Sequence, residues 1–443
     1  MKSLNTFFMK LLNKFKLLNI LLFLIVFQIT SFELYANKPS ITFESEIRQQ
    51  GLNIAIQKAI QTRRLSEMDR LSKERGSIEE EELAHEIAEY TADYTADETH
   101  ESSIRNFIEK NFGFSSNDLY CVAPERITKR EFVIIDKENA LVVKVFPQIP
   151  KHYFKIVHEL SGHEAFEGLH IKSINLVNFL ALGKYSLNGV EYILLGMSYA
   201  KGQEIRNYIE EIYDSKDLII KQKAIHSAKE ILQKLGGALG DIHLKGAIRI
   251  ALPEGYLEAF KVRYSKDVHN FLTEYQERGG EHREKLQIYF ENLLSQYNLQ
   301  TAIFSIFHGD AHLANFLYDK DNDCITVVDS VKSHLSVDSS GLPISNNYVH
   351  DIVKIENAIV RKILSHEVND ELINELIEAF HQGYDEKTAS LINPLSLNLD
   401  KSLLMLKHLA SSLKQGGDEN KKEYLQRSLE YYEKKLNLKT HQH

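Results

Sequence analysis

Residues that can move a proton or hold a cation crowd into one short segment, "IFHGDAHLANFL", at 306–317. It contains His308, Asp310 and Asn315, and Asp329 follows at the end of "ITVVD". An aspartate on a loop can accept or orient the proton of a hydroxyl group. Carboxylate and amide oxygens are the hard ligands that Mg²⁺ takes together with substrate phosphates. The spacing therefore predicts a site where a hydroxyl group, Mg²⁺ and a phosphate meet.

A lysine in an apolar stretch is the second feature that could do chemistry. Lys144 lies inside "ALVVKVF", with apolar residues on both sides. Burying an ammonium group without a partner is costly, so we expect a carboxylate beside it. Glu164 and Glu159, on the helix predicted next in the chain, are the candidates. A lysine placed in this way could neutralise phosphate charge while a phosphoryl group moves.

Two kinds of element must position these residues. "DLYCVAPE", "REFVIID" and "ALVVKVF" are rich in β-branched and aromatic residues and predict three antiparallel strands, with "DKEN" as a turn. A helical stretch and the buried strand "VEYILLGMSYAKG" follow. Helices then dominate, except around the motif at 306–317. The order predicts an α+β fold, with a small antiparallel sheet in an N-lobe and a mainly helical C-lobe.

These motifs, in this order, resemble the protein-kinase-like fold, and specifically its aminoglycoside phosphotransferase and choline kinase branch. "HGDAHLANFL" is similar to the catalytic loop of that branch, and "VVDS" to its metal-binding strand end. "LVVKVF" resembles the strand with the phosphate-pairing lysine, and "YILLGMSYAKGQEI" resembles the hinge whose backbone binds adenine. "LGGALGDIH", "YVHDIVKI" and "ELIEAFHQGYDE" resemble helices of the C-lobe. The similarity covers residues 113–385.

The resemblance implies catalytic and cofactor-binding roles for five residues. Asp310 would orient or deprotonate the acceptor hydroxyl, and Asn315 and Asp329 would hold Mg²⁺. Lys144 would contact the α- and β-phosphates of ATP, steadied by Glu164, which suits the spacing of the branch better than Glu159.

The resemblance also implies supporting roles around that centre. Gly196 and Met197 lie in the hinge segment and would contact the nucleotide, and Asp351 would brace the catalytic loop. His308 would be a structural hydrogen-bonding residue, and His312 is a candidate contact for solvent or acceptor.

The spacing between the motifs favours a small acceptor over a protein. His243, which ends "LGGALGDIH", and His308 are 65 positions apart, and "YLEAFKVRYSKDVHNFLTEY" predicts a helix between them. Small-molecule kinases of the branch use such an insertion to build an acceptor pocket. Asp351 follows Asp329 after only 22 positions, which leaves little room for a regulated activation loop.

Composition excludes some classes of protein. Hydrophobic residues make up 43% of the 443-residue chain and charged residues 26%, which is typical of a globular protein. A net charge of −9 argues against nucleic-acid binding, which needs clustered Lys and Arg. Cys121 and Cys324 permit one disulfide, but two buried thiols are favoured over it.

The N-terminal segment predicts export. Lysines precede the apolar run "LLNILLFLIVFQITSFEL", and a cleavage site at Ala36 makes 1–36 a predicted signal peptide of a secreted protein. An uncleaved membrane anchor is the alternative, and membrane contact is expected through this segment only. Residues 37–112 predict an acidic helical extension, whose replacement is expected to leave the core folded.

The remaining boundaries follow from the motifs. An N-lobe is predicted over 113–200, a C-lobe with the acceptor-site insertion over 201–385, and C-terminal helices over 386–443. The predicted function is Mg²⁺-dependent transfer of the γ-phosphate of ATP to a hydroxyl of a small molecule or headgroup. The alternatives are a binding module without turnover, favoured by the absence of glycine from the hairpin "APERITKREF", an exported kinase acting on a protein, and nucleotidyl transfer.

Overall fold

The structure is a computed structural model. It describes residues 92–94, 100–112, 119–121, 132–137, 139–147, 166, 169–251, 255–298, 301–329, 347–388, 393–413, 419–436 and 438. The predicted signal segment and the candidates Glu159 and Glu164 lie outside these residues. Among the described residues, no helix is both long and apolar enough to cross a bilayer.

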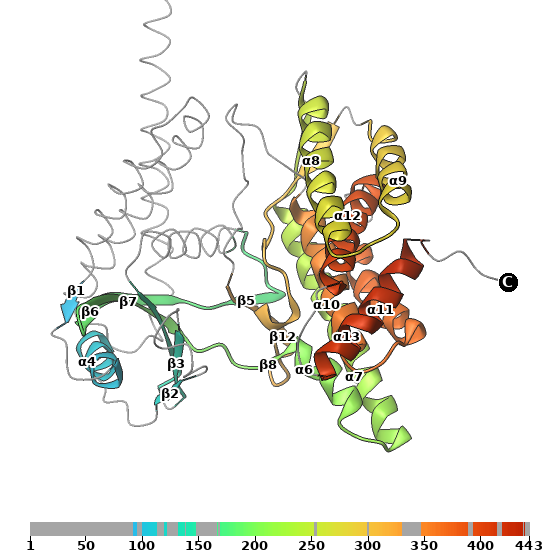
Figure 1. The fold of residues 1–443 in the computed structure, drawn as a ribbon. Helices are drawn as coiled ribbons and strands as arrows, with labels where there is room; N and C mark the ends of the chain where they lie inside the picture. Colours follow the sequence, from blue (N-terminus) through green and yellow to red (C-terminus); the bar gives the residue numbers. More distant parts are fainter. Residues whose placement is uncertain are drawn as a thin grey trace, which may run out of the picture.

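A six-stranded sheet forms the N-lobe (Figure 1). Its order is β1 (Ala92–Tyr94), β6 (Phe179–Leu187), β7 (Val190–Ser198), β4 (Leu141–Pro147), β3 (Phe132–Asp136) and β2 (Leu119–Cys121). The strands from β6 to β2 are antiparallel, as predicted, and β1 pairs in parallel with β6 at the edge. Asn188 and Gly189 join β6 to β7 with φ angles of 52° and 75°, which the tight turn of a two-residue hairpin requires.

Helix α4 (His100–Phe112) seals one face of this sheet. Ile104, Phe107 and Ile108 are fully buried against apolar side chains of β3, β4, β6 and β7. A Cβ at Gly196 would lie 3.3 Å from the Phe107 ring, so the helix approaches the strand closely where no side chain intervenes. The last helix of the predicted extension therefore packs in the N-lobe core, and the predicted boundary at residue 113 separates it from the sheet that it covers.

Helices build the C-lobe around α10 (Asn347–Leu364), α7 (Leu218–Lys245) and α11 (Asp370–Thr388). A Cβ at Gly236 of α7 would collide with the carbonyl of Phe380, and a Cβ at Gly383 of α11 with that of Gln233. These two glycines let α7 and α11 cross in backbone contact. The remaining helices are α6 (Ile205–Glu210), η4 (Glu211–Tyr213), α8 (Tyr256–Glu277), α9 (Arg283–Ser295), η5 (Leu313–Asn315), α12 (Pro394–Ser412) and α13 (Glu419–Lys435).

The stretch between His243 and His308 contains two helices. Helices α8 and α9 lie between β9 (Ile248–Ala251) and β10 (Thr301–Phe304), two strands that pair antiparallel and close the base of the insertion. The loop after β10 carries the crowded motif.

A second sheet, which the sequence did not predict, holds the hairpin of the motif. Its order is β5 (Ile174–Leu176), β12 (Cys324–Val327), β11 (Phe316–Asp319) and β8 (Gln203–Glu204). Strand β5 follows β4 in the chain, yet it pairs in parallel with β12 of the other lobe. Strand β5 pairs with β12 on one edge of the β11–β12 hairpin, and β8 pairs with β11 on the other (Figure 1). In the chain, β5 precedes β6 and β8 follows β7, so the segments just before and just after the β6–β7 hairpin fix the β11–β12 hairpin. The α+β, two-lobed architecture is confirmed.

Candidate active site

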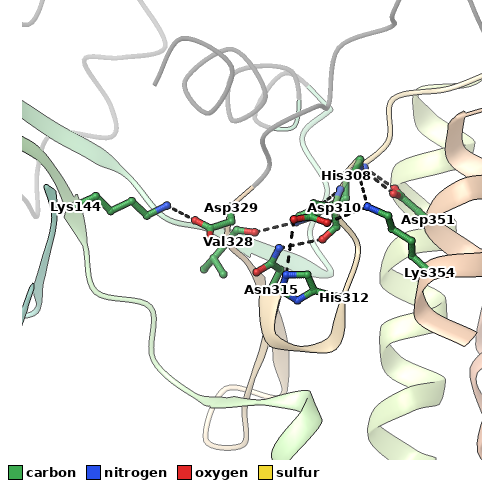
Figure 2. Close-up of polar contacts among 10 residues, drawn as sticks. Lys144, His308, Asp310, His312, Asn315, Val328, Asp329, Asp351 and Lys354 are labelled. Atoms are coloured by element: carbon green, nitrogen blue, oxygen red, sulfur yellow. Dashed lines mark hydrogen bonds and ion pairs between the residues drawn. The ribbon is translucent and has the colours of Figure 1, made fainter. Parts of the chain in front are cut away.

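The predicted catalytic loop is held through its backbone N–H groups by one buried carboxylate. Asp351 of α10 is fully buried, and its carboxylate accepts the N–H groups of His308 at 2.5 Å and Gly309 at 2.9 Å (Figure 2). Gly309 has φ of 79°, a left-handed conformation that favours glycine. The side chain of Asp351 therefore specifies the turn that leads into Asp310, and it occupies the bracing position that the resemblance implies.

His308 belongs to the same buried scaffold. Its Nε2 donates to the carbonyl of Val328 at 2.8 Å, and its Nδ1 accepts the N–H of Asp310 at 3.2 Å. Burial lowers the pKa of His308, so the neutral ring with its proton on Nε2 fits both bonds. His308 thus connects the predicted catalytic loop to the end of β12. The single proton of its neutral ring is held in the hydrogen bond to the Val328 carbonyl.

Asn315 closes the loop over Asp310. Its Nδ2 donates to the Asp310 backbone carbonyl at 3.0 Å. The backbone carbonyl of Asn315 accepts the N–H of Val328 at 3.0 Å. The N–H of His312 donates to the same Asp310 carbonyl at 2.8 Å. Since Nδ2 is engaged by the loop, the side-chain oxygen of Asn315 is the atom left for a ligand. The hydrogen bond from Val328 places Asn315 beside the end of β12, and Asp329 is the next residue in the chain after Val328.

Asp310 is half exposed and held on one side. Lys354 of α10 donates to its Oδ1 at 2.9 Å and to the Gly309 carbonyl at 3.0 Å, and His312 Nε2 lies 3.8 Å from Oδ2. Burial would raise the pKa of Asp310, but the hydrogen bond and charge of Lys354, helped by His312 and His308, lower it below its ordinary value. Asp310 is therefore an ionised acceptor at neutral pH.

Lys144 and Asp329 meet between the lobes. Their ion pair joins β4 of the N-lobe to the end of β12 across 185 positions of sequence (Figure 2). Lys144 lies on the sheet face opposite to α4, because Val143 and Val145 on either side of it pack into the α4 core. Asp329 has φ of 56°, a conformation that is costly outside glycine and is found at functional sites.

The predicted hinge residues lie within the sheet. Gly196 and Met197 belong to β7 and pair with Val143 and Val142 of β4 on one side, while β6 flanks them on the other. The chain leaves the sheet after Ser198 and enters β8 at Gln203. The nucleotide contact of Gly196 and Met197 stays a prediction. Residues 199–202 are the segment that connects β7 of the six-stranded sheet to β8 of the second sheet.

The sequence did not assign a supporting role to two residues, Lys354 and His243. Lys354 stands three residues after Asp351 in "DIVK", so both face the loop from one side of α10, and this spacing is the signal that could have revealed it. His243, at the end of α7, is fully buried with Nε2 3.5 Å from Asp351 Oδ2, and its Nδ1 is 2.8 Å from the Tyr384 hydroxyl. His243 thus links the Asp351 carboxylate to Tyr384 of α11.

The donor set fits a hard cation. Asn315 supplies an amide oxygen and Asp329 a carboxylate, and the hydrogen bond from Val328 to Asn315 keeps them adjacent. In the part of the chain that the structure describes, no three His, Cys, Asp or Glu side chains gather as a metal cluster. A cation bound by these two residues would take its other ligands from phosphate or water, which is common for Mg²⁺.

Solved structures of small-molecule kinases resemble the chain, although no family model and no curated protein matches its sequence. A glucosamine kinase matches with a TM-score of 0.50 at 10% identity, over 77% of this chain and 88% of that one. The chain has a protein-kinase-like fold. An amicoumacin kinase in complex with AMP-PNP and Ca²⁺ matches with a TM-score of 0.47 and 14% identity, over 76% of this chain and 94% of that one. A microcompartment-associated aminopropanol kinase matches with a TM-score of 0.40 and 14% identity, over 73% and 94%. The match with the glucosamine kinase confirms the fold that the sequence motifs imply.

Proposed function

We propose that the chain is an ATP-dependent phosphotransferase that moves the γ-phosphate of MgATP to a hydroxyl of a small molecule. The observation that carries this proposal is the convergence of Lys144, Asp310, Asn315 and Asp329, which come from two lobes, on one site. A structural role alone does not require a lysine, two carboxylates and an amide in this arrangement at the end of one hairpin. The helical insertion α8–α9 supports a small acceptor, since it stands directly before the catalytic loop.

Each residue has a role that follows from its position. Lys144 would bind the phosphates of ATP from the N-lobe, and Asn315 and Asp329 would hold Mg²⁺, which when bound would neutralise phosphate charge. Asp310 would accept a hydrogen bond from the acceptor hydroxyl and align its oxygen with the γ-phosphorus. Because its carboxylate is already paired, Asp310 is a weak base, so it would take the proton late in the transfer.

Calorimetry of MgATP binding to the full chain tests the nucleotide half of the proposal. Asp329→Asn is expected to abolish the dependence of ATP affinity on Mg²⁺, while Asp321→Asn, on the turn of the same hairpin, should leave it unchanged. Wild-type affinity that is the same with and without Mg²⁺ would contradict the assignment of Asp329.

Transfer itself is tested with radiolabelled ATP and a panel of aminosugars and amino alcohols, the classes named by the structural neighbours. Label should pass to at least one acceptor, and Asp310→Asn should abolish transfer while ATP still binds. Label on proteins only would instead favour an exported kinase with a protein acceptor, and AMP attached to an acceptor would indicate nucleotidyl transfer.

A binding module without turnover is the second candidate. The predicted phosphate-covering hairpin "APERITKREF" contains no glycine, so the close approach of backbone to phosphate that glycine permits is missing from its sequence. MgATP binding without transfer or hydrolysis, unchanged by Asp310→Asn, would support this candidate. We also propose that the segment 1–36 exports the chain, which N-terminal sequencing of the secreted fraction would test.

A further inference from the structure

Helix α10 contacts the catalytic loop through two side chains one turn apart. Asp351 accepts the backbone N–H groups of His308 and Gly309, and Lys354 donates to the Gly309 carbonyl and the Asp310 carboxylate. One face of α10 therefore holds both the backbone of the loop and the side chain on which the proposed reaction depends.

The two oxygens of Asp310 have different surroundings. Oδ1 accepts Lys354 at 2.9 Å, whereas no hydrogen bond to Oδ2 is found in the part of the chain that the structure describes. Asp310 and His312 each have 47% of the side chain exposed, but Lys354 has only 25%. Lys354, the least exposed of the three, therefore contacts Asp310 through Oδ1, and the more exposed His312 lies nearer to Oδ2.

We propose that Lys354 is a positioning residue, which clamps Asp310 by Oδ1 so that Oδ2 is presented to the acceptor hydroxyl. A carboxylate on a loop can rotate about χ2, which would exchange its two oxygens and turn its lone pairs away from the acceptor. A charge-assisted hydrogen bond to one oxygen, from a lysine that also grips the preceding carbonyl, removes that freedom. This inference rests on the proposed phosphotransferase function.

The clamp predicts a loss in turnover rather than in nucleotide binding. For Lys354→Met we expect kcat for MgATP hydrolysis, with water as acceptor, to fall about 100-fold, the lower end of the range for positioned acid–base groups. KM for MgATP should change by less than about threefold, since the orientation of the acceptor acts in the transition state. Lys354→Arg, which keeps the charge and the donor, should recover at least about a tenth of the wild-type kcat.

Lys362→Met is the matched control. Lys362 lies two turns further along α10, pairs with Glu210, and has 22% of its side chain exposed, close to the 25% of Lys354. It faces α6 and not the loop. Its replacement removes a lysine from the same helix and is expected to leave kcat unchanged. A similar fall of kcat in both variants would overturn the clamp and indicate a general effect on α10.

A double-mutant cycle separates this inference from the proposed function. If Lys354 acts through Asp310, adding Lys354→Met to Asp310→Asn should lower kcat no further, and their losses in melting temperature should be less than additive. Additive losses in melting temperature would overturn the clamp whether or not the chain turns over ATP. Non-additive melting losses in a chain whose wild type transfers phosphate to neither water nor any acceptor would support the contact and overturn the phosphotransferase.

Discussion

The two sides of the candidate site are held in different ways. On the C-lobe side, Asp351, His308 and Lys354 fix the catalytic loop through hydrogen bonds, and the first two are fully buried. On the N-lobe side, Lys144 stands on a sheet whose core lies on the opposite face, and its ion pair with Asp329 crosses between the lobes. The three side chains that hold the loop therefore all belong to the C-lobe. The position of Lys144 relative to it depends on the N-lobe core and on how the lobes meet.

A mutation in the N-lobe core should destabilise the N-lobe and leave the C-lobe unaffected. Phe107→Ala removes a fully buried ring from the contact of α4 with the sheet and should lower the free energy of unfolding of this lobe by about 3 to 5 kcal/mol. Hydrogen exchange should then increase in β3, β4 and β7 but not in α7, α10 and α11. The exposed Tyr120 of the same lobe is the control, and its replacement by alanine should cost less than about 0.5 kcal/mol. Equal increases in both lobes would contradict their separate cores.

Loss of the buried brace should have the opposite effect. Asp351→Ala leaves the N–H groups of His308 and Gly309 without their acceptor, at about 1 to 3 kcal/mol for each buried group. We expect turnover to fall to background while the N-lobe keeps its protection from exchange. Glu230→Ala, which removes an exposed pair with His226 on α7, should cost less than about 1 kcal/mol. Wild-type turnover in Asp351→Ala would show that the loop does not need its brace.

Removal of the N-lobe lysine should affect ligand binding more than stability. Lys144→Met is expected to weaken MgATP binding roughly 10- to 100-fold, the equivalent of one lost hydrogen bond to a charged group. The free energy of unfolding should change by less than about 1 kcal/mol, since Asp329 has 43% of its side chain exposed. Calorimetry and chemical denaturation measure the two effects, and the exposed turn residue Lys137→Met is the control. If Lys144→Met lowered the free energy of unfolding but bound MgATP normally, Lys144 would be a structural residue and not a nucleotide-binding one.

The smallest expected effect concerns the far side of α10. Burial would raise the pKa of Glu356, but its hydrogen bond with His381 at 2.7 Å and the charge of Lys401 lower it below 4.5. A carboxyl group whose pKa is lower in the folded protein stabilises it above pH 4.5, and this contribution is lost as the pH falls further. The melting temperature of Glu356→Gln should therefore depend less steeply on pH below 4.5 than that of the wild type. Parallel curves would show that Glu356 does not contribute to acid sensitivity.

Local patterns carried much of the prediction. Asp310, Asn315 and Asp329 were recognisable because the loop and hairpin that hold them are continuous in sequence. The β-branched and aromatic residues of β3 and β4 placed Lys144 on a strand. The predicted hinge residues Gly196 and Met197 lie inside β7, because an apolar run does not mark where a strand leaves its sheet. Strand β5 has three residues and no pattern of its own, so its pairing with β12 could not be predicted.

The sequence by itself determined the types of chemical group, their order and the helical insertion between His243 and His308, because each depends on neighbours along the chain. Only the tertiary structure decided which groups touch. It paired Lys144 with Asp329, put α4 into the N-lobe core, and brought Lys354 to one oxygen of Asp310. Such contacts depend on the angles at which helices and lobes pack, and these are set by the sum of many buried side chains rather than by any local pattern.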